Sequence, residues 1–133
     1  MTVSKPQRSV LLRVFSLVAV GFGALTLKEG GGVLFGDVAA RAAAGNYVPF
    51  VLWANFCAGF FYIAAGIGLW LHRVWAMWLA LAILLATLLT YAAFGMHIAT
   101  GGAFEMRTVI AMGIRSGVWL LIGAAAYRLL RRH

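Results

Sequence analysis

Four long apolar runs constrain this chain more than any other feature of its sequence. They cover residues 9–27, 47–71, 74–95 and 108–130, and an α-helix needs about 20 apolar residues to cross the hydrocarbon core of a bilayer. The runs are apolar on all sides and lack the two-residue alternation of a membrane β-barrel strand. The sequence therefore predicts an all-α fold, a single four-helix transmembrane bundle over residues 1–133.

Composition supports a bilayer as the environment of this bundle. Of the 133 residues, 64% are hydrophobic and 11% are charged, while a soluble chain of this size buries only about two-thirds of its unfolded surface. The net charge of +8 comes from basic residues at the ends of the apolar runs. This placement indicates lipid headgroups and not nucleic acid as the partner.

The loop after the first run contains signals for a break and a new helix. Gly30, Gly31 and Gly32 are expected to end the first helix, because glycine is the poorest helix former after proline. The following residues 33–44 are alanine-rich and carry Asp37 and Arg41 at i,i+4 spacing. They predict a short helix on the external membrane surface.

Orientation follows from the distribution of lysine and arginine. The first run has no clear small-x-small cleavage site, so we expect it to be retained as a helix. With the N-terminus inside, seven basic residues face the cytoplasm: Lys5, Arg8, Arg13, Arg73, Arg128, Arg131 and Arg132. Three face outward: Lys28, Arg41 and Arg107. All three acids then lie outside, none of them within a run. The sequence predicts a multi-pass protein of the cytoplasmic (inner) membrane with both termini inside.

Arg115 is the most informative charged residue, since it lies roughly 12 Å into the fourth run. A charge at such a depth costs about 2.5–3.5 kcal/mol on insertion scales, so it should face the bundle and find polar partners. Matching depths on the other helices indicate these partners: Asn55, Thr87, Thr90 and Tyr91, with Glu105 or Glu29 as countercharge. The functional interpretation is an external anion-binding or quinone-type pocket; the structural one is a network that joins helices.

Two further sequence patterns indicate a possible site or interface less specifically. Met96, His97, Met106 and Met112 gather around the third loop, and thioether and imidazole ligands suit copper(I). Methionine is also a common gap filler in apolar helices, so the cluster has an ordinary packing interpretation. Gly113 and Gly117 form a G-x-x-x-G pair, which favours close helix packing within the bundle or between copies.

The second and third runs contain a glycine-rich helix, residues 58–69, followed by the short turn His72-Arg73 and the apolar stretch Val74-Trp75-Ala76. A link this short predicts an antiparallel helix hairpin. The arrangement resembles the DoxX-like superfamily of small four-helix bacterial membrane proteins. The resemblance covers about half the chain. It implies a subunit or maturation partner of a quinone-linked redox system.

These observations favour a non-catalytic subunit or accessory factor of a membrane redox or envelope system, acting as a homo-oligomer or in a larger complex. No paired carboxylates or nucleophile–base pairs favour an enzyme. The alternatives are a small oligomeric transporter and a protein that binds a quinone or another lipophile around Arg115. The transporter hypothesis is weakened because proton coupling in similar four-helix exporters uses an intramembrane carboxylate, and none occurs within the four runs.

Overall fold

A computed structural model describes residues 5–35, 38–45 and 48–130, and every regular element in these ranges is a helix. Four helices are long: α1 (Lys5–Leu34), α3 (Pro49–Trp70), α4 (Val74–Ala99) and α5 (Met106–Leu130). The short helix α2 (Val38–Ala44) joins α1 to α3. The four long helices are each long and apolar enough to cross a membrane, and this confirms the predicted four-helix architecture.

Two helices are capped at their C-terminal ends by a residue in the left-handed backbone conformation. Past the end of α3, His72 takes φ +59°, while the amides of His72 and Arg73 donate to Leu69 O and Gly68 O, at 3.1 and 2.9 Å. This is a Schellman cap, which satisfies carbonyls left free at a helix end. It reverses the chain and confirms the predicted α3–α4 hairpin. The same cap ends α4, where Gly101 takes φ +88°.

The predicted break at Gly30–Gly32 is wrong, because α1 continues through all three glycines to Leu34. A Cβ on Gly30 would lie 3.2 Å from Cδ1 of Phe56, so the glycine lets α3 approach closely. Close packing and the need to satisfy backbone groups within an apolar environment outweigh the poor helix propensity of glycine. The second helix is therefore shorter than predicted, at 38–44. Asp37 lies outside the described residues, as does the side chain of Arg41.

Small residues bring α1 and α3 into the closest contact of the bundle. Gly23 faces Gly59, and the Ser16 hydroxyl donates to Gly66 O at 2.5 Å. Ser16 and Gly23 are seven residues apart on α1, and Gly59 and Gly66 are seven residues apart on α3. Because seven residues are close to two helical turns, the two contacts lie on the same face of each helix. In contrast, a Cβ added to Gly117 of the predicted G-x-x-x-G pair would meet no atom within 4 Å. Within the single chain, the closest helix interface is therefore formed by α1 and α3, and Gly117 of α5 takes no part in such a contact.

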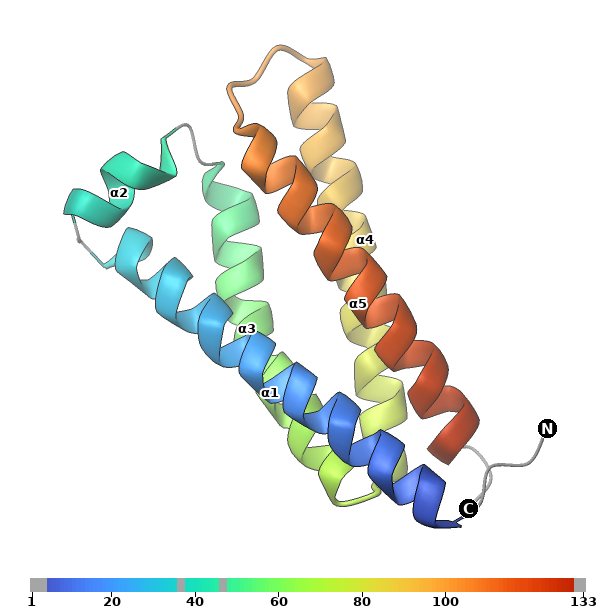
Figure 1. Ribbon diagram of the computed structural model, residues 1–133. Coiled ribbons are helices and arrows are strands. Elements are labelled where there is room, and N and C mark those ends of the chain that lie inside the picture. The colour runs from blue at the N-terminus through green and yellow to red at the C-terminus, as the bar shows by residue number, and fades with distance from the viewer. Residues whose placement is uncertain (1–4, 36–37, 46–47, 131–133) are drawn as a thin grey trace.

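The helices are arranged as two pairs, α1 with α3 and α4 with α5. Figure 1 shows that the pairs converge where α1 begins and α5 ends, and diverge toward α2. The larger buried cluster fills the convergent end and centre, where Leu12, Tyr62, Ala80 and Trp119 meet from four helices. A smaller cluster around Val51, Phe94 and Met112 joins α3, α4 and α5 nearer the open end. The divergence leaves space between the pairs on the α2 side.

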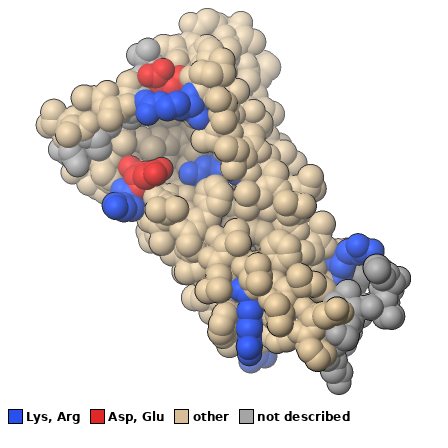
Figure 2. All heavy atoms as spheres, in the orientation of Figure 1, with Lys and Arg blue, Asp and Glu red and all other residues tan. Residues whose placement is uncertain are grey.

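The outer surface is strongly apolar. Leu17, Leu85, Leu89 and Leu121 are 60–65% exposed, although each lies on a helix within a candidate membrane span. In a bilayer these side chains would meet lipid tails, so their exposure carries no hydrophobic cost. On the face drawn in Figure 2, the charged side chains of the described residues lie toward the ends of the molecule and around the hollow at its open end.

Candidate functional site

A cavity of about 490 Å³ lies between α1, α3 and α5 at the open end, with Ala43 of α2 at its rim. Figure 2 shows this hollow, with acidic and basic side chains around it. Much of the wall is apolar, from Val33, Val51, Leu52 and Phe56. The polar and charged lining consists of Thr26, Glu29, Asn55, Glu105, Arg107, Thr108 and Arg115. The cavity therefore combines an apolar wall with charged groups of both signs.

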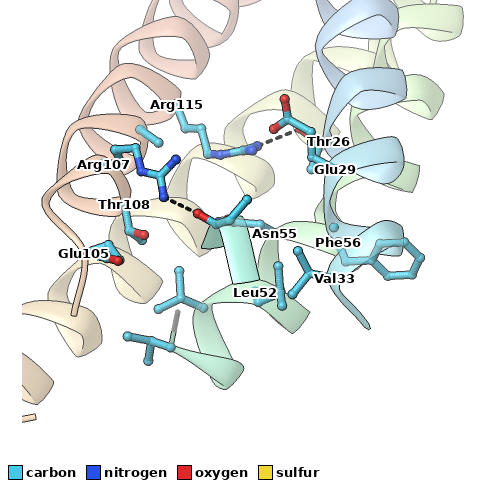
Figure 3. Close-up of a pocket in the computed structure, with 15 residues that line it drawn as sticks. Thr26, Glu29, Val33, Leu52, Asn55, Phe56, Glu105, Arg107, Thr108 and Arg115 are labelled. Carbon is cyan, nitrogen blue, oxygen red and sulfur yellow. Dashed lines mark hydrogen bonds between the residues drawn. The ribbon is translucent and has the colours of Figure 1, made fainter. Parts of the chain in front are cut away.

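Arg115 reaches into this cavity from the third turn of α5, about 14 Å along the helix axis from Met106. Its Nη1 donates to Thr26 Oγ1 at 2.9 Å and to Tyr62 Oη at 3.3 Å. Figure 3 shows the side chain extending across the cavity toward Thr26. Among the described residues, no acceptor is bonded to Nε or Nη2. A guanidinium has five N–H donors, so most of them remain for water or a ligand.

Two aromatic rings lie close to the guanidinium of Arg115. Its central carbon lies 5.0 Å from the ring centroid of Phe22 and 5.9 Å from that of Tyr62. Tyr62 packs in turn against Trp119, with the ring centroids 4.7 Å apart. Cation–π contacts stabilise a cation by about 0.5–2 kcal/mol each, and the value rises as the cation loses water. Two rings and two hydroxyls therefore support the positive charge, and no carboxylate in the described chain lies within ion-pair distance of it.

Glu29 lines the same cavity, and its position differs from the one expected from the sequence. Because α1 continues to Leu34, Glu29 lies inside a candidate membrane span, whereas all acids were expected in loops. It follows Thr26 by three residues, so the two side chains share one face of α1. Figure 3 shows both on the wall opposite Arg115. The site thus contains a carboxylate one helical turn from the hydroxyl that binds the guanidinium.

Glu105 and Arg107 lie at the mouth of the cavity, at the start of α5. Arg107 Nη2 donates to Ala43 O, at 2.5 Å, and ties α5 to α2. The Glu105 side chain approaches Gly45 closely, near the place where a Cβ would stand. Glu105 therefore lines the predicted pocket at its rim, just before the start of α5 and nearer the open end than Arg115.

The other predicted partners of Arg115 make their hydrogen bonds elsewhere. Asn55 lines the cavity, but its Nδ2 lies 3.5 Å from the sulfur of Met112. The hydroxyl of Tyr91 donates to Val109 O at 3.0 Å, and that of Thr87 donates within α4 to Ile83 O at 2.7 Å. Thr87 and Thr90 line a separate, mostly apolar cavity of about 260 Å³ between α3 and α4, which Asn55 also borders.

Of the residues predicted to bind copper, Met96 and His97 lie near the end of α4, and Met106 begins α5. Met96 and Met106 are 67% and 59% exposed, and one nitrogen of His97 lies 3.0 Å from Ala103 O. In the ranges that the structure describes, no three His, Cys, Asp or Glu side chains are grouped to hold a metal ion.

Thr26, Tyr62 and Phe22 are the site residues that sequence reasoning missed. Depth along the helices selected Asn55, Thr87, Thr90 and Tyr91 as the polar partners, and none of the three residues was among them. The available signal was a polar residue in each apolar run: Thr26 is 3% exposed and Tyr62 is 0% exposed. Buried polar groups require partners, and here the partner is Arg115.

Comparisons with known proteins leave this site without a relative: no family model, no curated protein and no solved structure matches the chain. Inference of function therefore depends on the geometry of the cavity.

Proposed function

We propose that this chain is a non-catalytic membrane protein that binds an amphiphilic ligand in the cavity between its helix pairs. The observation that carries the proposal is Arg115, a guanidinium deep within an apolar bundle whose free donors face a cavity of about 490 Å³. A charge within a membrane span is costly, and intramembrane ionisable residues are usually functional. An acceptor group of the ligand would bind Arg115, and its apolar part would lie against Val51, Leu52 and Phe56.

The ligand class follows from the wall of the cavity. Pockets that bind small molecules are mostly apolar, with a few polar groups that orient the ligand. A planar guanidinium binds the paired oxygens of a phosphate or carboxylate well, and it also binds a quinone carbonyl. A lipid headgroup, a lipophilic acid or a quinone fits this requirement. Copper has no comparable support.

Native mass spectrometry of the detergent-solubilised protein, with identification of co-purified lipophilic molecules, tests the proposal. We expect Arg115→Leu to lose the bound ligand, and Arg115→Lys to restore little of it because an ammonium lacks the planar fork. The helical circular dichroism should persist in both, since intramembrane hydrogen bonds contribute only about 0.6 kcal/mol each.

Arg128→Leu is the matched control, because it removes an exposed arginine of the same helix far from the cavity. If Arg115→Leu keeps the ligand as well as this control does, Arg115 is a structural residue and the proposal is wrong.

The proposed topology has the open end outside and both termini in the cytoplasm, in the inner membrane. Among the described residues, the helix ends at the convergent end carry Arg8, Arg13, Arg73 and Arg128 and no acid. The open end carries the acids Glu29 and Glu105 with the bases Lys28 and Arg107. This bias agrees with the positive-inside rule. In this orientation, α2 would lie on the external membrane surface.

The protein would act with others, as a homo-oligomer or as an accessory subunit of a redox or envelope system. The resemblance to DoxX-like proteins favours this role. Affinity purification in mild detergent, followed by identification of bound proteins, tests it: recovery of the chain alone, as a monomer, would contradict it.

A transporter is the second candidate, and Glu29 favours it. Proton-coupled transport requires a carboxylate within the membrane, and Glu29 lies inside α1 on the cavity wall. Flux of a lipophilic cation or acid into vesicles, driven by a proton gradient, would be lost in Glu29→Gln. A flux that is insensitive to this substitution would reject the mechanism.

A further inference from the structure

Two opposite charges share the cavity without binding each other. Glu29 lines it from α1 and Arg115 from α5. The guanidinium is bonded to Thr26 and Tyr62, and in the described ranges no hydrogen bond or ion pair joins it to Glu29. The other basic residue that lines the cavity, Arg107, donates to Ala43 O. The cavity therefore presents a separate carboxylate beside a separate guanidinium.

One turn of α1 separates Glu29 from the threonine that binds the guanidinium. Thr26 accepts the bond from Arg115, and Glu29 follows Thr26 by three residues on the same face of α1. Side chains at i and i+3 are about 5–6 Å apart at Cβ. A purely anionic ligand bound at Arg115 would lie in the same cavity as the Glu29 carboxylate, and the two negative charges would repel each other. A ligand that also carries a cation would be attracted by both.

We propose that the ligand is a zwitterion, with its acidic group at Arg115 and a primary ammonium at Glu29. This inference rests on the proposed function and specifies its substrate class. A phosphoethanolamine group has this chemistry, because a short linker separates its phosphate from its ammonium. It occurs as the headgroup of phosphatidylethanolamine and as a free molecule, and the apolar wall of Val51, Leu52 and Phe56 favours the lipid form.

Native mass spectrometry with two lipids of identical acyl chains tests the proposal. We expect the wild-type protein to bind phosphatidylethanolamine about tenfold more tightly than phosphatidylglycerol, as one charge-assisted hydrogen bond predicts. Glu29→Gln should remove this preference while Arg115 still binds both lipids. Lys28→Gln is the control, since it changes the charge of the neighbouring exposed residue, which does not line the cavity. It should keep the wild-type preference.

The outcomes separate this inference from the function on which it rests. Equal binding of the two lipids by the wild type, unchanged in Glu29→Gln, would overturn the zwitterion and leave Arg115 as a general acceptor site. Failure of both lipids to bind, with no other co-purified lipophile, would overturn both proposals. Displacement of bound phosphatidylethanolamine by soluble phosphoethanolamine would show that the headgroup alone is recognised. Lack of displacement, with the lipid preference intact, would show that recognition requires the lipid.

Discussion

Replacement of Gly23 by alanine should separate the two most closely packed helices. A Cβ at this position would lie 2.8 Å from Gly59 O, 2.8 Å from Cγ1 of Ile63 and 3.0 Å from Cβ of Tyr62. Two of these atoms belong to the backbone or to a Cβ, so they cannot rotate away. The helices α1 and α3 must move apart by several tenths of an ångström. Tyr62 would move with α3, and with it one of the two acceptors of Arg115.

The size of the effect can be isolated with a matched variant. Gly21 lies two residues earlier in α1, and a Cβ there would meet nothing within 4 Å. Both substitutions gain the same helix propensity, about 1 kcal/mol over glycine. Only Gly23→Ala has the overpacking penalty, which is typically about 1–3 kcal/mol. The difference between the two variants should therefore equal the steric term.

Reversible unfolding in mixed micelles, followed by circular dichroism, measures this difference. Gly21→Ala should be as stable as the wild type or more stable, and Gly23→Ala should be less stable than Gly21→Ala by about 1–3 kcal/mol. If both variants unfold at the same denaturant fraction, the contact between α1 and α3 is not as close as described, and Gly23 is not required for it.

Two other predictions concern the site and the topology. Thr26→Val keeps the side-chain shape but removes the hydroxyl that accepts from Arg115, so ligand affinity should fall severalfold while the unfolding free energy changes by only about 0.6–1.7 kcal/mol; an unchanged affinity would exclude Thr26 from the site. In a variant without the native cysteine, a membrane-impermeant thiol reagent added outside intact cells should label Gly101→Cys and not Arg73→Cys. The reverse pattern would invert the proposed orientation.

The sequence by itself determined the class of fold. Run lengths of about 20 apolar residues permit little else, because a membrane-crossing chain must satisfy its backbone hydrogen bonds internally. The two-residue link at His72 and Arg73 likewise determined the α3–α4 hairpin. Arg115 was identified as a residue that must face the bundle, since its cost in lipid depends on depth, and depth can be counted along the chain.

The partners of Arg115 were decided only by the tertiary structure. Counting residues gives the height of a side chain in the bundle, but not the direction in which it points or which helices are neighbours. The close approach of α1 and α3 at Gly23 and Gly59 is what sets Thr26 and Tyr62 side by side. This approach depends on the absence of Cβ atoms on two helices at once, a property of the pair that neither segment carries alone.

The role of Glu29 has the same origin. Local propensity predicted that Gly30–Gly32 would end α1 and leave Glu29 in a loop. Packing of Gly30 against Phe56 instead keeps the helix intact and turns Glu29 to the cavity wall. Glycine propensity is a local quantity of about 1 kcal/mol per residue, and contacts with a helix distant in sequence outweigh it. The sequence therefore shows that these charged residues exist, but helix packing decides that they line one cavity.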